Sequence, residues 1–251
     1  MIDALVLAGS PNDGQLKEYS AAKFEALIPV GKQTMVEYVV KALLHSERIR
    51  KVAVVGPSQI AKLFPEQDII VVPPQSNIAT NIYQGLQYLP DAHRVLVATS
   101  DIPLITHLAV DEFIKACGNC ERDIYFPVVP KDLVKRKFPQ AQRTYVKLKK
   151  GTFTGGNIFL INPDIVPRCL NLGQQLIDMR KSPARLCKML GFVFLLKFIT
   201  RQLTLEQVER KASSLLGVNG QAVVCRFPEV GVDIDKPSDL TLILDIMDIS
   251  S

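Results

Sequence analysis

The sequence predicts an α/β protein whose mostly parallel sheet lies between two layers of helices, with a helical insertion in its second half. In the first half, short apolar runs rich in β-branched residues alternate with longer segments of helical periodicity. Short runs of this kind are typical of buried parallel strands, and β/α alternation favours helices on both faces of the sheet. The predicted strands are Leu5–Ala8, Val52–Val55, Ile69–Val72 and Val95–Ala98.

Two segments between these strands carry an apolar stripe at helical spacing, Met35–Leu44 and Ile78–Leu89. Ligands of parallel sheets bind beyond the carboxyl ends of the strands. Three loops are expected at that edge, Gly9–Gly14, Pro73–Asn77 and Ser100–Pro103. The functional residues should therefore come from these loops.

The second half has a different pattern. Tyr145–Lys149 alternates between polar and apolar residues, and Ile158–Ile161 is a further apolar strand. Residues 171–217 consist of several helical segments, and a returning strand follows at Ala222–Phe227. The helix boundaries there are marked by Ser182-Pro183, Gly191, Thr204 and Gly217. We predict one domain over residues 1–251, in which 171–217 form an insertion that serves as a lid or an oligomerisation element.

Length and composition are those of a soluble globular protein: 251 residues, of which 47% are hydrophobic and 22% charged. No apolar run reaches the ~18–20 residues that cross a bilayer, and the start, Met1-Ile2-Asp3, lacks the basic region of a secretory signal. We therefore expect a cytoplasmic protein without a membrane partner. Five cysteines, an odd number, agree with a reducing compartment. Cys117 and Cys120 are expected as inert thiols where Gly118 ends a helix, because no second ligand pair for zinc exists.

Basic residues concentrate between positions 131 and 150, where eight Lys and Arg side chains accompany one acid, Asp132. They are Lys131, Lys135, Arg136, Lys137, Arg143, Lys147, Lys149 and Lys150. Such a block indicates either a solvated surface or a negatively charged partner, a nucleic acid or a polyphosphate substrate. Its only aromatic residues are Phe138 and Tyr145, too few to stack on bases, so nucleic-acid binding is not expected.

The first predicted strand ends in a loop rich in Gly, Ser, Pro, Asn and Asp, residues 9–14. Backbone N–H groups in a loop at this place suit phosphate oxygens, which predicts a ligand that carries phosphate. The loop is not a Walker motif, because Gln15 and Leu16 stand where Lys and Ser or Thr are needed. A G-x-G-x-x-G fingerprint is absent as well.

Acidic residues occur at two further places that suit a site. Asp101 directly follows the fourth predicted strand. Near the C-terminus, Asp233 and Asp235 alternate with Val232 and Ile234 in an extended segment, so that both acids face one side. Carboxylates at a sheet edge can hold a hard divalent cation against phosphate oxygens. A turn or N-cap role is the open alternative for Asp101 and for Asp235.

Five motifs follow one another along the chain: the Leu-Ala-Gly loop, Ala-Leu-Ile-Pro-Val-Gly at 26–31, Ser-Asp-Ile-Pro at 100–103, Thr-Gly-Gly-Asn at 154–157 and Asp-Ile-Asp at 233–235. In this order and spacing the chain resembles the MobA-like nucleotidyltransferases from about residue 3 to 246, apart from 171–217. The resemblance implies a three-layer α/β/α sandwich. It also implies an Mg²⁺-dependent enzyme that transfers a nucleoside monophosphate from a nucleoside triphosphate (NTP) to a phosphorylated acceptor and releases pyrophosphate.

The resemblance further implies roles for individual residues. Asp101 and Asp235 match the metal-binding aspartates. We predict Asp101 as catalytic together with Lys17 and Lys23, which are not family matches but could supply a cation that the family's loop would carry. The acceptor-binding residues that it implies are Thr154, Gly155, Gly156 and Asn157. The nucleotide-binding residues that it implies are Leu7, Ala8, Gly9, Ser10, Asn12, Asp13, Gly14, Pro74, Asn77 and Ser100. The implied partners are the NTP and a phosphorylated small molecule, and a homodimer is left open.

One departure from the family pattern concerns charge. The family's loop carries Arg and Lys, whereas Glu25 precedes Ala26-Leu27-Ile28 here and residues 9–14 include no basic side chain. The candidates to replace the missing cation are Lys17, Lys23, Lys32 and the basic block at 143–150. The alternative function is therefore a catalytically degenerate protein that binds a nucleotide or metabolite on the same fold. A glycosyltransferase is disfavoured, because the Asp-x-Asp motif is missing after the fourth strand.

Overall fold

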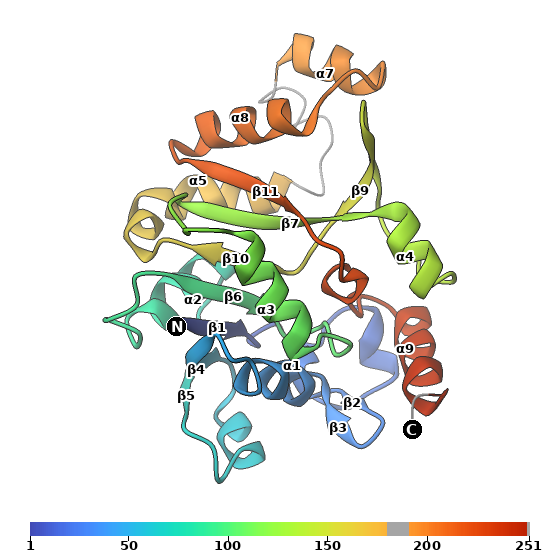
Figure 1. Cartoon of the computed structure of the whole chain (residues 1–251). Helices are drawn as coiled ribbons and strands as arrows, with labels where there is room; N and C mark the ends of the chain where they lie inside the picture. Colours follow the sequence, from blue (N-terminus) through green and yellow to red (C-terminus); the bar gives the residue numbers. More distant parts are fainter. Residues whose placement is uncertain (180–190, 250–251) are drawn as a thin grey trace.

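A nine-stranded sheet forms the centre of the protein (Figure 1), for which the computed structural model describes residues 1–179 and 191–249. The strands follow the order β5-β4-β1-β6-β10-β7-β9-β8, and β11 pairs with β7. A separate hairpin consists of β2 and β3. The strand bounds are β1 (Ile2–Leu7), β2 (Pro29–Val30), β3 (Gln33–Thr34), β4 (Ile49–Val55), β5 (Ile69–Val72), β6 (Val95–Thr99), β7 (Ile124–Pro130), β8 (Val146–Leu148), β9 (Gly151–Gly155), β10 (Ile158–Ile161) and β11 (Gly220–Val224).

Most of these strands point the same way. β1 lies between β4 and β6 in parallel, and β5 extends the parallel set beyond β4. β10 runs antiparallel to both β6 and β7, so β7 and its parallel neighbour β11 share the direction of β6. The carboxyl ends of β1, β6 and β7 therefore meet at one edge, where ligands of such sheets bind. The prediction of a mostly parallel sheet is confirmed.

Helices cover both faces of the sheet (Figure 1). The α-helices described are α1 (Met35–Leu44), α2 (Ile78–Leu86), α3 (His107–Ala116), α4 (Lys131–Lys137), α5 (Val166–Met179), α7 (Phe192–Ile199), α8 (Leu205–Leu216) and α9 (Pro237–Ile249). One hydrophobic core lies against α1, α3 and α9, and the other lies against α2 and α5. Successive residues of β1 alternate between them, since Ala4 and Val6 belong to the first core and Leu5 to the second. This is the predicted three-layer α/β/α sandwich.

Local signals explain where the first two helices begin and end. α1 has the predicted bounds, because Thr34 and Glu37 form a capping box in which the Glu37 carboxylate accepts from the Thr34 N–H at 2.7 Å. α2 ends at Leu86, three residues before the predicted end at Leu89. Leu89 lies between turns after the helix and is buried in the second core. It therefore fits the apolar pattern because it packs in the core, although it is not part of the helix.

Within the predicted insertion, 171–217, the structure describes the end of α5 together with α7 and α8. α5 begins at Val166, before the predicted start of the insertion, and contacts α2 of the second core. Thr204 starts α8 with a capping box and Gly217 ends it at φ 65°, as predicted. The helix start at Ser182-Pro183 and the thiol of Cys187 lie outside the described residues. The lid and oligomerisation roles stay predictions.

The end of α3 confirms the helix stop predicted at Gly118, between the two cysteines. Cys117 is the C-cap residue, and Gly118 follows in the left-handed region at φ 62°. Burial raises the pKa of the Cys117 thiol to about 12, so this group stays protonated and unreactive at neutral pH. In the parts of the chain that the structure describes, no helix is both long and apolar enough to cross a bilayer.

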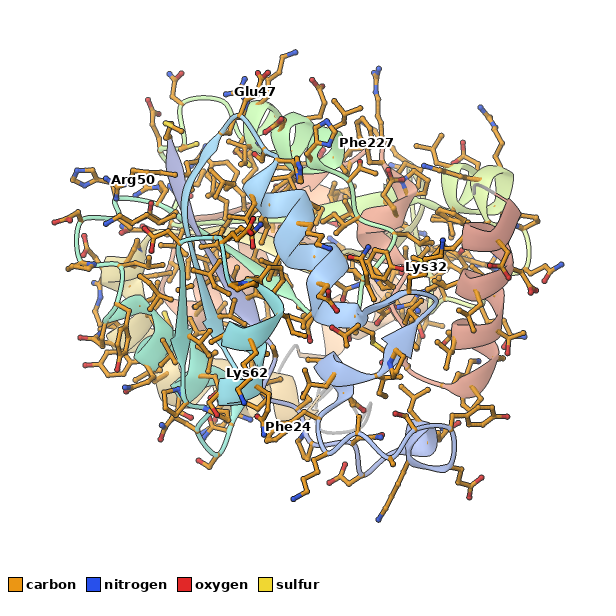
Figure 2. The ribbon with its side chains drawn as sticks, turned by 90° about the horizontal axis from the view of Figure 1, so that it is seen from below. Phe24, Lys32, Glu47, Arg50, Lys62 and Phe227 are labelled. Carbon is orange, nitrogen blue, oxygen red and sulfur yellow. The ribbon has the colours of Figure 1, made fainter. Side chains whose placement is uncertain are left out.

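A buried ion pair joins the first strand to the fourth. Asp3 is 1% exposed and accepts two hydrogen bonds of 2.8 Å from the guanidinium of Arg50, the residue labelled in Figure 2. Removing one partner of such a pair leaves a buried charge without compensation. Because Arg50 itself reaches solvent, we expect Arg50→Met to lower the free energy of unfolding by about 2 kcal/mol, less than for a fully buried pair.

Urea denaturation would measure this loss, with Arg48→Met as the matched control. Arg48 is exposed in the turn just before β4, and its side chain makes no hydrogen bond or ion pair with a described residue. The control should change the free energy of unfolding by no more than about 0.5 kcal/mol. Equal losses in the two variants would contradict the importance of the Asp3 contact.

Candidate active site

The loop after β1 folds back on itself and is held by its own backbone. The Asn12 N–H donates to the Lys23 carbonyl at 2.9 Å, and the Glu25 N–H donates to the Ser10 carbonyl at 3.0 Å. The buried Asn12 side chain also donates to the carbonyls of Ser20 and Ala22, both at 3.0 Å. Ser10 and residues 13–15 are exposed around this framework. The predicted phosphate loop is thus a fixed, solvent-facing turn at the carboxyl end of β1.

The second predicted loop lies directly against the first. A Cβ atom on Gly9 would come within 2.6 Å of the Pro74 Cβ, so only glycine allows this approach. Asn77 caps α2, where its side-chain oxygen accepts from the Thr80 N–H at 2.9 Å. The structure therefore brings Pro74 to the loop as predicted, while the side chain of Asn77 is engaged in the helix cap.

Three carboxylates meet at the end of β6. Asp101, Asp233 and Asp235 offer oxygen atoms that all lie within 4.8 Å of one another. The two segments are tied by a hydrogen bond of 2.9 Å from the Ile234 N–H to the Asp101 carbonyl. Val232 and Ile234 pack into the core, so Asp233 and Asp235 lie on the other side of the segment as the alternation predicted, with Asp233 buried and Asp235 exposed. The predicted pair of Asp101 and Asp235 is brought together.

Asp233 is the residue that the predicted site set left out. The alternation of acidic and apolar residues had placed Asp233 on the same side as Asp235. This pattern was enough to predict Asp233 as a further residue of the metal site. Asp235 does not cap α9 with its side chain; instead, the Asp239 carboxylate accepts from the Asp235 N–H at 3.2 Å. The Asp235 carboxylate is exposed and accepts no hydrogen bond from a described residue. It is therefore available to a ligand.

The electrostatics of the cluster disfavour three free charges. Burial raises the pKa of Asp101 from its ordinary value of 3.8, and the charge of Asp235 adds to this effect. Two partners act in the opposite direction: the Thr99 hydroxyl donates to Asp101 at 2.5 Å, and the Arg143 guanidinium lowers the pKa of Asp101 from nearby. Arg143 forms an ion pair with Asp233. One cation thus faces three carboxylates, which leaves an excess of negative charge.

Glu25 increases that excess. Its carboxylate lies 3.8 Å from where a Cβ of Gly14 would stand, so it faces the phosphate loop. Burial raises the pKa of Glu25, and the charges of Asp101, Asp235 and Asp13 raise it further, so Glu25 belongs to the same negatively charged region. The position where the family pattern has a lysine is therefore occupied by a fourth acid of the site.

The predicted lysines do not lie in the cluster. Lys17 and Lys23 are exposed, and neither side chain makes a hydrogen bond or ion pair with a described residue. Lys32 is exposed at the turn between β2 and β3, apart from Phe24 of the loop in Figure 2. The cation that does lie there is Arg143 of the basic block, as one of the sequence alternatives allowed. The physical reason is that the loop path turns these lysines toward solvent.

The predicted acceptor segment, residues 154–157, passes between the end of β6 and the segment 230–235 that carries Asp233 and Asp235. The Asn157 carbonyl accepts from the Thr99 N–H at 3.0 Å, and the Asn157 N–H donates to the Val230 carbonyl at 2.9 Å. Gly156 is required there, because a Cβ would come within 2.7 Å of Val230 and closer still to Pro127. Thr154 is buried on β9. The segment thus borders the carboxylates on the side away from the phosphate loop.

The three acids suit a magnesium ion. Carboxylate oxygens are hard ligands of the kind that Mg²⁺ takes, and Mg²⁺ needs only one or two of them in addition to water and phosphate oxygens. The close approach of Asp101, Asp233 and Asp235 and the shortage of neighbouring cations both fit such an ion.

Stability without metal should depend on pH in a defined direction. Asp101 and Glu25 have raised pKa values in the folded state, so between the ordinary and the raised values the folded protein binds more protons than the unfolded chain. The free energy of unfolding therefore falls as pH rises through that window. We expect the wild type in a chelator to lose more stability than the double variant Asp101→Asn/Glu25→Gln as the pH rises above the ordinary pKa values of the two carboxyl groups, 3.8 and 4.5. Urea denaturation measures the difference, and equal slopes would contradict it.

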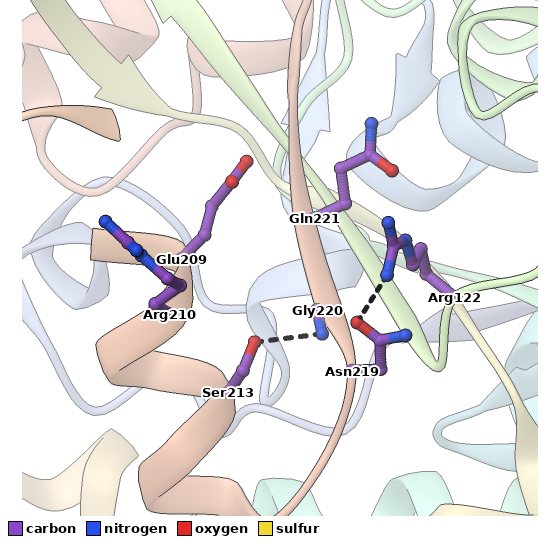
Figure 3. Close-up of a pocket in the computed structure, with 7 residues that line it drawn as sticks. All are labelled: Arg122, Glu209, Arg210, Ser213, Asn219, Gly220 and Gln221. Atoms are coloured by element: carbon purple, nitrogen blue, oxygen red, sulfur yellow. Dashed lines mark hydrogen bonds between the residues drawn. The ribbon is translucent and has the colours of Figure 1, made fainter. Parts of the chain in front are cut away.

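A separate cavity of about 420 Å³ lies between α8 and β11 (Figure 3). Its polar lining is already paired in part: Arg122 donates to Asn219 at 2.8 Å, and the Gly220 N–H donates to the Ser213 hydroxyl at 3.0 Å. Gly220 begins β11 beside Ile124 at the start of β7, so the cavity opens at the amino ends of these strands. It is on the edge opposite the carboxylates.

Comparisons with known proteins show which family the chain belongs to. The family model of the MobA-like NTP transferase domain matches residues 20–182, a range that includes Asp101 and the segment 154–157. No curated protein matches the sequence. Among solved structures, one described as a hypothetical transferase from Thermus thermophilus is 33% identical, with a TM-score of 0.82 over 96% of this chain and 100% of that one.

Two more distant structures share the fold. A nucleotidyl transferase from Methanothermobacter thermautotrophicus is 16% identical with a TM-score of 0.62, and the coverage is 100% of this chain and 99% of that one. A CMP:2-keto-3-deoxy-manno-octonic acid synthetase complexed with CTP is 10% identical with a TM-score of 0.61 at the same coverage. From the matched model and the 33% identical structure, we conclude that the chain belongs to the family of MobA-like NTP transferase domains.

Proposed function

We propose that the protein is an Mg²⁺-dependent nucleotidyltransferase that moves a nucleoside monophosphate from an NTP to a phosphorylated small molecule. The observation that carries the proposal is the meeting of Asp101, Asp233 and Asp235 at the sheet edge next to a fixed phosphate loop. Membership of the family supports nucleotidyl transfer in general. The related synthetase that holds CTP is an example of the same fold around a nucleoside triphosphate.

Each part of the site has a role in this reaction. The exposed backbone of residues 9–14 binds the triphosphate, with Pro74 beside it toward the base. Asp101 and Asp235 hold Mg²⁺, and Asp233 keeps Arg143 in place. When bound, Mg²⁺ supplies positive charge against the phosphate oxygens. The reaction needs no nucleophilic side chain, because the acceptor phosphate itself attacks the α-phosphorus.

The test measures the melting temperature of the purified protein with each of the four ribonucleoside triphosphates and Mg²⁺. Stabilisation by one or more of them, abolished in Asp101→Asn, is the expected result. Melting temperatures that no triphosphate raises would refute the proposal. A second assay follows pyrophosphate release with sugar phosphates and polyol phosphates as acceptors.

Glu25 favours one second candidate, a nucleotide- or metabolite-binding protein without transferase activity. The carboxylate lies where the family pattern has a cation, so the charge that forms on pyrophosphate has less compensation here. Nucleotide binding without pyrophosphate release in the presence of any acceptor would select this candidate over the enzyme.

A further inference from the structure

Next to the carboxylates, three hydrogen-bond donors converge and lack full partners. They are the Arg143 guanidinium, the Tyr145 hydroxyl and the Lys131 ammonium group. Arg143 and Tyr145 are two residues apart in an extended segment, so their side chains lie on the same side of it. Both are partly buried, while Thr144 between them is exposed. The segment thus directs two donors toward the site.

Arg143 uses only part of its donor capacity. Its two terminal nitrogens are directed at Asp233, one in an ion pair with the carboxylate and one at 3.4 Å from the backbone carbonyl. Its Nε atom is buried and has no partner. A guanidinium carries five N–H groups, so Arg143 can hold Asp233 and a further anion.

Tyr145 and Lys131 complete the set. The Tyr145 hydroxyl is buried without a partner. Val146 pairs with Phe153, so the register of the β8–β9 hairpin sets Tyr145 across from Thr154, in the acceptor segment. The Lys131 Nζ lies over the Tyr145 ring, 5.3 Å from its centroid, and makes no hydrogen bond or ion pair with a described residue.

Hydrogen-bond donors that are buried without an acceptor indicate a binding site for an anion. A buried polar group without a partner destabilises the folded protein, and an oxygen-rich ligand would remove that cost. Two cations and a hydroxyl suit a phosphate group, which offers several acceptor oxygens and negative charge. Both the Arg143 Nε and the Tyr145 hydroxyl are shielded from solvent.

We propose that Arg143, Tyr145 and Lys131 form the subsite that binds the phosphate group of the acceptor. The inference rests on the proposed nucleotidyl transfer and identifies the acceptor as a phosphomonoester. In that reaction an acceptor oxygen forms a bond to the α-phosphorus, the bond from this phosphorus to the oxygen bridging to the β-phosphorus breaks, and pyrophosphate leaves with that electron pair. The subsite lies beside Asp233, on the side of the cluster where the segment 154–157 also runs.

The experiment uses inorganic phosphate as the probe and the full chain at constant ionic strength with Mg²⁺. Calorimetric titration would compare wild type with Tyr145→Phe and Lys131→Gln. We expect saturable binding to wild type and about tenfold weaker binding to each variant, the effect of losing one charged or buried hydrogen bond. Arg136→Gln removes a similar charge from the exposed face of α4, away from Tyr145, and should bind phosphate like wild type.

The same proteins are then titrated with the Mg²⁺–NTP complex to separate the two proposals. Unchanged NTP affinity in Tyr145→Phe and Lys131→Gln supports an acceptor subsite. Equal phosphate affinity in all four proteins would overturn the proposed acceptor subsite. A loss of NTP affinity in Tyr145→Phe and Lys131→Gln would overturn it as well, because the donors would then bind the triphosphate. Phosphate binding that depends on Tyr145 in a protein that binds no NTP would refute the proposed transferase and leave the anion site standing. Near-ultraviolet circular dichroism confirms the fold of each variant.

Discussion

Replacing Asp101 with asparagine is expected to lower the rate of nucleotidyl transfer by at least about a hundredfold, the scale on which charged groups at a transition state act. Asp101 lies at the centre of the site, where Asp233 and Asp235 approach it and its backbone carbonyl accepts from Ile234. Asparagine keeps the shape and the hydrogen bond with Thr99 but removes the charge that holds Mg²⁺. Steady-state pyrophosphate release measures the loss.

Asp91→Asn is the matched control for this prediction. Asp91 is exposed ahead of β6, at the opposite edge of the sheet, so the same chemical change should leave the rate as in wild type. The melting temperature of Asp101→Asn without metal should be equal to or above that of wild type, because burial disfavours the Asp101 charge. A wild-type rate in Asp101→Asn would refute its role at the metal.

Replacing Glu25 with glutamine is expected to tighten NTP binding by about tenfold at low Mg²⁺, and less at saturating Mg²⁺. The Glu25 carboxylate faces Gly14 of the phosphate loop and feels the charges of Asp101 and Asp235. An incoming triphosphate adds further negative charge at the same place. Glu25 should therefore make nucleotide binding strongly dependent on the divalent cation, and glutamine should relax that dependence.

Calorimetric titration of NTP across a range of Mg²⁺ concentrations tests this expectation. Glu18→Gln is the control, since Glu18 is an exposed acid of the same loop and its side chain makes no hydrogen bond or ion pair with a described residue. A Glu25→Gln protein that binds NTP more weakly than wild type at every Mg²⁺ concentration would contradict the prediction. That outcome would instead make Glu25 a ligand of the cation.

Features that depend on neighbouring residues in the chain were predictable. The bounds of α1 follow from a cap at Thr34 and a regular apolar stripe, both of which act within a few residues. The alternation of Val232 and Ile234 with two acids determined which side chains face the core, because an extended chain has a period of two. The order of the motifs along the chain was sufficient to identify the family. The closeness of Asp101 and Asp235, which are far apart in the chain, was expected from the family resemblance rather than from any local pattern.

The tertiary structure decided how distant segments combine. Nothing local in the sequence pairs Arg143 with Asp233, places Glu25 opposite Asp101, or leaves Lys17 and Lys23 in solvent. These relations depend on the path of the loop after β1 and on the insertion of β10 between β6 and β7, which brings the hairpin of β8 and β9 to the sheet edge. The physical reason is the distance along the chain over which each interaction acts. Helix capping and periodicity depend on residues a few positions apart, whereas the charge balance of the site arises from side chains that only tertiary packing brings together.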